Sequence, residues 1–317
     1  MKKIVVLFLL LFPLTGFGQA KLQKVRVTPQ WTPQSQFAGI YMAKEKGFYE
    51  EVGLDVEIIH PSAAVSSANL LRSGKTDIIT SQLIEAMIYK DSGLNIVNIL
   101  QTAEHNSLYI LSREPLESIK DLNHKKIGRW SAGFTELAMA FASANALDIE
   151  WIPVLTNIAV YISGALDATL CMGYNEFFQL KMSGTPITEK QIVRLRDIGY
   201  DVPEDGFYTL ESYATANPTV VAHFVEATKR GWLWANEPEN REETLDCVMR
   251  MVDADNLPTN RVNQAFMLDE LLRLQRNDDG EAPFFLTKER FDFTTQLLLE
   301  NNFIIDPIRY EDFVRTY

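Results

Sequence analysis

Three adjacent residues, Tyr174-Asn175-Glu176, carry side chains that could together hold a flat nitrogen heterocycle. They follow an apolar run, residues 167–171, that predicts a buried strand. The tyrosine ring offers a stacking face, and the asparagine and glutamate groups offer donors and acceptors for a ring edge that bears an amino group. The same residues suit a helix start, with Asn175 as the cap and Glu176 in the first turn. Both roles can hold at once, so we expect this group to contact a ligand.

A second aromatic and polar group lies in the loop after the first predicted strand, residues 24–28. Pro33 interrupts the backbone there, so the loop carries Trp31, Gln34 and Gln36. Ligands of α/β sheets collect at the carboxyl ends of the strands. We therefore expect Trp31 and Gln34 to contact a small molecule. The alternative for Trp31 is a role as an anchor of the hydrophobic core.

Two further polar positions share this placement. Ser81 and Gln82 follow the predicted strand 77–80, so they should lie at the same edge of the sheet as Trp31. The segment Glu204-Asp205-Gly206 lies in a turn-rich stretch. It could place an acid in the cleft, but its residue types favour a hinge.

Residues suited to catalysis or metal binding are sparse in this sequence. It contains no Gly-x-Ser-x-Gly elbow and no phosphate-binding loop. Cys171 and Cys247 are too few for a disulfide framework, although a single bridge between them stays open. Metal-ligand spacing is absent among the histidines, which are His60, His105, His124 and His223. We expect no catalytic residue, no metal and no cofactor.

Composition narrows the class of protein. Residues 1–20 combine a basic start, a short apolar run and small residues, which is typical of a secretory signal peptide. Without them the chain has 28 basic and 42 acidic residues, a net charge of −14, which disfavours nucleic acid and anionic membranes as partners. The apolar content of 46% supports a packed core. We expect an exported, periplasmic protein that is soluble after cleavage and monomeric.

The pattern of apolar residues predicts alternating strands and helices, followed by a mostly helical C-terminal region. Such alternation indicates βαβ units with parallel strands. Strands are expected at 24–28, 53–59, 77–80, 95–100, 107–112, 125–130, 148–153, 167–171, 192–195 and 207–210. Helices are expected at 40–46, 63–71, 84–92, 134–145, 158–164, 177–182, 220–235, 241–252, 261–276 and 288–301.

Two α/β lobes joined by two hinge crossings explain this order of elements. About 295 mature residues exceed the usual size of a single core. Residues 107–112 and 207–210 are extended and are expected to be the two crossings. We therefore expect residues 21–112 and 208–317 to form one lobe and residues 113–207 to form the other.

Several segments resemble a known protein family. Trp31-Thr32-Pro33, residues 39–49, Gly53-Leu54-Asp55-Val56 and residues 73–77 follow one another as in the thiamine-pyrimidine-precursor group of periplasmic binding proteins for ABC importers. The wider family includes riboflavin, alkanesulfonate and nitrate binders and the fungal thiamine pyrimidine synthase. The resemblance covers nearly all of the mature chain through Tyr208. It implies an α/β, bilobed periplasmic-binding-protein fold of type II, with a helical C-terminal region.

The resemblance also implies a function and roles for site residues. A protein of this group would capture an aminopyrimidine, such as formylaminopyrimidine or hydroxymethylpyrimidine, by hinge closure and deliver it to an ABC permease in the inner membrane. Glu176 would bind the aminopyrimidine edge, and Trp31 would stack on or wall the ring. Gln34 stands where the group has asparagine, and the order within Tyr174-Asn175-Glu176 is altered. These departures leave other ligands open, riboflavin or an alkanesulfonate among them.

The family's enzyme is a weaker alternative for this chain. Where the fungal synthase places a cofactor-bearing lysine and then a sacrificial histidine, the matching positions here are Ser81 and Glu85. The cysteine-rich motif of the synthase is missing, so we expect no enzyme activity. A sensor or adaptor that binds a partner protein is a further alternative.

Overall fold

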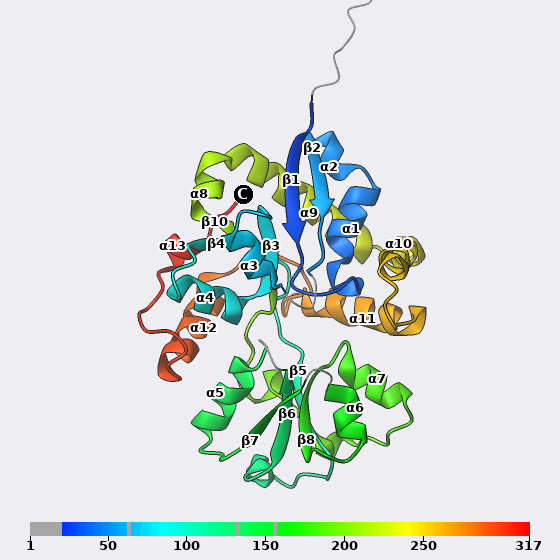
Figure 1. The fold of residues 1–317 in the computed structure, drawn as a ribbon, viewed down its shortest axis with the longest axis vertical. Helices are drawn as coiled ribbons and strands as arrows, with labels where there is room; N and C mark the ends of the chain where they lie inside the picture. Colours follow the sequence, from blue (N-terminus) through cyan, green and yellow to red (C-terminus); the bar gives the residue numbers. More distant parts are fainter. Residues whose placement is uncertain (1–20, 62–64, 131–133, 155–156) are drawn as a thin grey trace, which may run out of the picture.

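The computed structural model describes residues 21–61, 65–130, 134–154 and 157–317. It contains two five-stranded sheets with helices packed around each, and the two resulting lobes lie one above the other in Figure 1. The expected two-lobed α/β architecture with a helical C-terminal region is confirmed. The expected signal peptide, residues 1–20, lies outside the described residues.

The sheet of the first lobe has the strand order β2-β1-β3-β10-β4. Strand β1 pairs in parallel with β2 and β3, whereas β10 runs antiparallel between β3 and β4. The chain enters β10 from the other lobe, and this reverses its direction relative to strands that follow a crossover helix. The five strands are β1 (Gln23–Thr28), β2 (Leu54–Ile58), β3 (Ile78–Gln82), β4 (Ile96–Gln101) and β10 (Asp205–Leu210).

The sheet of the second lobe has the same plan, with the order β7-β6-β8-β5-β9. Strand β5 runs antiparallel to β8 and β9, so each sheet is mixed: the two segments expected as crossings, 107–112 and 207–210, supply the antiparallel strands β5 and β10. Residues 108–112 were expected in the first lobe, but their hydrogen bonds join them to the second sheet. The strands are β5 (Leu108–Ser112), β6 (Lys126–Trp130), β7 (Glu150–Val154), β8 (Ala168–Met172) and β9 (Ile192–Arg194).

Helices cover the sheets close to the predicted positions. The helix expected at 63–71 is present as α3, which begins at Ser67 after the capping residue Ser66, and positions 63 and 64 lie outside the described residues. Helices that follow strands are α1 (Ala38–Glu45), α2 (Phe48–Glu51), α3 (Ser67–Arg72), α4 (Leu83–Asp91), α5 (Glu136–Ala144), α6 (Asn157–Ile162) and α7 (Glu176–Met182). The C-terminal helices are α8 (Glu211–Ala216), α9 (Pro218–Asn236), α10 (Arg241–Ala254), α11 (Arg261–Leu274), α12 (Lys288–Glu300) and α13 (Tyr310–Phe313).

Two glycines allow α1 and α9 to pack at close range. A Cβ atom added at Gly231 would overlap the carbonyl oxygen of Gly39, and one added at Gly39 would overlap the Trp232 ring. The backbones therefore touch without intervening side chains. This contact fixes α1, and with it the loop between β1 and α1 that carries Trp31.

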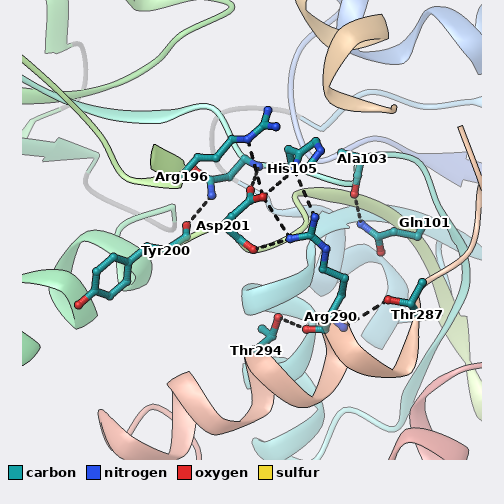
Figure 2. A network of polar contacts seen from close by, with 10 residues as sticks. Gln101, Ala103, His105, Arg196, Tyr200, Asp201, Thr287, Arg290 and Thr294 are labelled. Atoms are coloured by element: carbon teal, nitrogen blue, oxygen red, sulfur yellow. Dashed lines mark hydrogen bonds and ion pairs between the residues drawn. The ribbon is translucent and has the colours of Figure 1, made fainter. Parts of the chain in front are cut away.

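A buried polar network ties together the two segments that connect the lobes. His105 lies between β4 and β5, and its Nδ1 is 2.6 Å from Asp201 Oδ2 in the segment between β9 and β10 (Figure 2). Arg290 of α12 donates to the same Asp201 oxygen at 3.1 Å. Burial raises the pKa of Asp201, but the contacts with His105 and Arg290 outweigh this effect and hold that pKa below its usual value. The two segments are therefore bound to each other and to the first lobe.

Candidate functional site

A pocket lies between the lobes, at the carboxyl ends of β1, β3, β6 and β8. The arrows of β1 and β2 in Figure 1 point toward the second lobe, as this position requires. The pocket contains about 350 Å³ of empty volume, including the part that is open to solvent. We call it the aromatic compartment. The described residues that line it are Gln30, Trp31, Gln34, Gln36, Gln82, Trp130, Phe134, Met172, Tyr174, Asn175 and Glu176.

Aromatic side chains from both lobes meet in this compartment. Trp31 and Phe134 are arranged edge to face, with 6.0 Å between their ring centroids, and Phe134 contacts Trp130 in the same way at 6.1 Å. Trp31 is 39% exposed, which excludes its alternative role as a core anchor. Phe134 has a φ angle of 61°, a left-handed conformation that is unfavourable for a bulky residue. Strained residues of this kind concentrate at functional sites.

His60 holds the backbone of Trp31 in place. Its Nδ1 lies 2.7 Å from the Trp31 carbonyl oxygen, and its Nε2 lies 2.8 Å from the Tyr41 hydroxyl. A carbonyl oxygen can only accept, so Nδ1 carries the proton in the neutral ring and Nε2 accepts from Tyr41. Burial lowers the pKa of His60, although the contact with Trp31 opposes this shift. This role was not predicted from the sequence, because His60 is distant from Trp31 along the chain.

Glutamine side chains and one aspartate form the base of the aromatic compartment on the side of the first lobe. Gln36 donates to Asp205 Oδ2 at 2.6 Å, and Gln30 donates to Asp205 Oδ1 at 2.7 Å. Gln34 donates to Gln36 Oε1 at 2.5 Å. Burial raises the pKa of Asp205 to about 6, and the two amide donors limit the rise. Asp205 is the first residue of β10, so the expected hinge segment 204–206 also contributes an acid behind the pocket.

Two long-range contacts fix this glutamine group. Gln264 of α11 accepts from the Ser35 backbone N–H at 2.7 Å, and its carbonyl oxygen accepts from the Ser35 hydroxyl at 2.7 Å. Across the cleft, Gln36 Nε2 lies 3.4 Å from the Tyr174 hydroxyl oxygen. The two lobes are therefore in contact through polar groups as well as through Trp31 and Phe134.

The residues Tyr174, Asn175 and Glu176 form the second-lobe side of the compartment. Glu176 is partly exposed, and its Oε2 accepts from the Met172 backbone N–H at 3.0 Å. Asn175 occupies the N-cap position of α7 but makes no capping hydrogen bond with its side chain. Its Oδ1 accepts from Gln179 at 2.6 Å. Burial raises the pKa of Glu176, while hydrogen bonds from backbone N–H groups and from Trp130 oppose the rise.

Six of the seven predicted site residues line the aromatic compartment, and Ser81 does not. Neighbouring side chains of a strand point to opposite faces, so Gln82 reaches the compartment while Ser81 is buried behind it. The Ser81 hydroxyl lies 3.4 Å from Glu85 Oε2. The sequence did not single out five other lining residues as ligand contacts: Gln30, Gln36, Trp130, Phe134 and Met172. Position after a predicted strand was the available signal for Trp130 and Met172.

The titratable groups near the compartment are acidic. Burial, and to a smaller extent the charge of Glu136, raises the pKa of Glu85 to about 8. No lysine, arginine or histidine is present among the described lining residues. In the described part of the chain no cluster of His, Cys, Asp and Glu could hold a metal ion. Cys171 and Cys247 are both buried and unbridged.

The fold and the pocket define a class of protein. The structure of the aliphatic sulphonate binding protein SsuA from Escherichia coli superposes with a TM-score of 0.67, over 90% of this chain and 95% of that chain, at 14% identity. A match at this identity establishes the fold, which is the expected periplasmic-binding-protein fold. The chain belongs to the NMT1/THI5-like family, whose model matches residues 34–241.

Two relatives indicate what proteins of this kind do. The formylaminopyrimidine-binding protein of Halalkalibacterium halodurans is 25% identical over 277 residues, which cover 84% of this chain and 82% of that protein. A 4-amino-5-hydroxymethyl-2-methylpyrimidine phosphate synthase of Saccharomyces cerevisiae is 25% identical over 184 residues, 54% of each chain. Fold and family together support a solute-binding role. No helix among the described residues has the length and hydrophobicity needed to cross a membrane.

Proposed function

We propose that this protein is the exported substrate-binding component of an ABC importer and that it captures a pyrimidine precursor of thiamine. The ligand would be an aminopyrimidine such as formylaminopyrimidine or hydroxymethylpyrimidine. The observation that carries this proposal is the aromatic compartment, where Trp31 and Phe134 from opposite lobes meet edge to face beside the carboxylate of Glu176. Small-molecule sites typically combine apolar walls with a few polar groups that fix orientation.

The contacts suggest how such a ligand would be held. A flat ring packed against Trp31 and Phe134 would contact both lobes, and the Glu176 carboxylate would accept from an exocyclic amino group. Contacts to both lobes favour the closed arrangement, so closure and binding would be coupled through the hinge. The chain would act as a monomer and would present the closed form to the permease.

The charge of the compartment supports a heterocycle over an anion. Glu176 lines it, Asp205 and Glu85 lie behind it, and its described lining residues include no basic side chain. An alkanesulfonate or nitrate ion would meet no countercharge there and would be repelled by the carboxylates. An uncharged or protonated aminopyrimidine meets no such penalty.

A thermal-shift screen tests this function. Hydroxymethylpyrimidine and formylaminopyrimidine are compared with thiamine, riboflavin and an alkanesulfonate, and isothermal titration calorimetry follows on each compound that raises the melting temperature. A ligand at a hundred times its dissociation constant adds about 2.7 kcal/mol of stability. A shift with the sulfonate and none with the pyrimidines would show that the assignment is wrong. An absorbance scan with added pyridoxal phosphate checks the synthase alternative, for which we expect no new band.

A further inference from the structure

A second compartment adjoins the aromatic compartment and shares Gln82 and Phe134 with it as wall residues. It contains about 320 Å³ of empty volume, including the part that is open to solvent. Much of its wall is aliphatic and comes from both lobes, with Ile84 on one side and Leu137 on the other. We call it the acidic compartment, because Glu204 and Glu136 also line it.

Glu204, a lining residue of this compartment, has an unused acceptor. The side chain is only 3% exposed, and its Oε1 accepts from the Ser107 backbone N–H at 2.6 Å. Its Oε2 is buried and has no hydrogen-bond partner in the described structure. A buried polar atom without a partner is costly, so such atoms are rare unless something else satisfies them. By contrast, the neighbouring Asp205 uses both carboxyl oxygens on glutamine donors.

Three acidic side chains lie near Glu204. Asp205 is the next residue and begins β10, Asp201 lies in the same connecting segment and is paired with His105 and Arg290, and Glu136 lines the compartment from α5. The Tyr174 hydroxyl is the other titratable group close by. Burial and then the charge of Asp205 raise the pKa of Glu204 well above its usual value. The described residues lining the acidic compartment include no basic side chain.

We propose that the acidic compartment receives a positively charged primary amine attached to the ligand ring, with Glu204 Oε2 as its hydrogen-bond acceptor. This inference rests on the proposed function, because it places the ring itself in the aromatic compartment. An ammonium group supplies both the missing donor and a countercharge for the carboxyl groups. A hydroxyl group supplies a donor alone, and charge-assisted hydrogen bonds are roughly twice as strong as neutral ones. The preferred ligand is therefore an aminopyrimidine with an aminomethyl arm.

The test compares two pyrimidines that differ in one group, 4-amino-5-aminomethyl-2-methylpyrimidine and its hydroxymethyl analogue, by calorimetry on the full-length mature protein at pH 7. Wild type should bind the aminomethyl compound at least tenfold more tightly. Glu204→Gln keeps an oxygen acceptor for the Ser107 N–H but removes the acidic one, so it should reduce the preference to less than threefold. Equal or weaker binding of the aminomethyl compound by wild type would overturn the proposal. Retention of the full preference by a folded Glu204→Gln protein would also overturn it.

Two further variants keep the result decisive. Glu136 lies at the edge of the acidic compartment, so Glu136→Gln should weaken the preference about threefold. This variant replaces Glu204→Gln if the Glu204→Gln protein does not fold. Glu104→Gln is the matched control, since Glu104 is a buried acid with a raised pKa that lines neither compartment. It should leave the preference unchanged. An equal loss in the Glu104 and Glu136 variants would show a general effect of charge and overturn the specific site.

Benzylamine and benzyl alcohol separate this inference from the proposed function. They carry the same two arms on a ring without a pyrimidine edge. If neither pyrimidine binds but benzylamine binds more tightly than benzyl alcohol in a manner that depends on Glu204, the pyrimidine assignment fails and the amine site stands. If both pyrimidines bind equally and Glu204→Gln changes neither, the amine site fails and the proposed function stands.

Discussion

The two sides of the aromatic compartment are held in place by different kinds of contact. On the first-lobe side, hydrogen bonds join residues far apart in the chain, as between Gln36 and Asp205 or between Ser35 and Gln264. On the second-lobe side, most polar contacts of Glu176 and Asn175 are local, from Met172 and to Gln179, and one comes from Trp130 of β6. Long-range contacts fix the first side before a ligand arrives. We infer that the first lobe provides a preorganised surface and that the second lobe closes on it.

The largest expected effect comes from disrupting the packing of α1 against α9, which supports the first-lobe side of the aromatic compartment. Gly231→Ala should destabilise the protein by about 3 kcal/mol, because the added Cβ overlaps the Gly39 backbone and neither helix can move without the other. Urea unfolding measures the change in the free energy of unfolding. Leu233→Ala on the same helix is the control, since Leu233 is more than half exposed, and it should change stability by less than about 0.5 kcal/mol. Similar losses in both variants would contradict the close packing of α1 and α9.

The second prediction concerns Glu176, the charged residue on the second-lobe side of the aromatic compartment. Glu176→Ala should weaken binding of hydroxymethylpyrimidine by about 100-fold, because the ligand amino group loses a charged acceptor. Calorimetry gives the dissociation constants. The melting temperature without ligand should change little, since Glu176 is partly exposed.

Two comparison variants sharpen this result. Glu176→Gln retains an acceptor for the Met172 N–H and should bind with intermediate affinity. Glu114→Ala, at an exposed position of the second lobe, should bind like wild type. Unchanged binding by Glu176→Ala would remove Glu176 from the site.

The contrast between local and long-range contacts also explains which features could be predicted from the sequence. Trp31, Gln34, Gln82 and the group 174–176 were predicted because each follows an apolar run, and strand ends gather at one edge of a sheet. These are local signals. Membership of a sheet is not local, so residues 108–112 were assigned to the first lobe although they pair with strands of the second sheet.

The acids that matter at the site were hidden for a related reason. Glu204 and Asp205 look like turn residues in the sequence, and they are buried only because β10 pairs between β3 and β4. In that position two glutamines bind Asp205, whereas one oxygen of Glu204 has no partner. Glu85 lies in the predicted helix 84–92, where no local pattern indicates that it is buried. Its burial depends on the second lobe, whose Phe134 backbone N–H donates to its carboxyl group. Burial by a distant segment leaves no periodic pattern in the chain.

The third prediction concerns Glu85, which joins the two sides through Phe134. Its pKa in the folded protein is about 8, above its value in an unfolded chain, so the folded state binds the extra proton between these values. Stability should therefore fall as the pH rises from about 6.5 to 8.5. Glu85→Gln should reduce this fall by about 2 kcal/mol. Urea unfolding at both pH values measures it, and parallel curves for the two proteins would contradict the shifted pKa.

The smallest expected effect tests how the first side is held in place. His60→Phe keeps the ring contacts with Phe37 and Tyr41 but removes both hydrogen bonds, including the one that restrains the Trp31 carbonyl. Each such bond contributes about 1 kcal/mol, so ligand affinity should fall roughly fivefold to tenfold. His223→Phe on α9 is the matched control and should bind like wild type. If Trp31 is fixed by His60, combining His60→Phe with Trp31→Ala should cost no more affinity than Trp31→Ala alone. A fully additive loss would mean that His60 acts elsewhere.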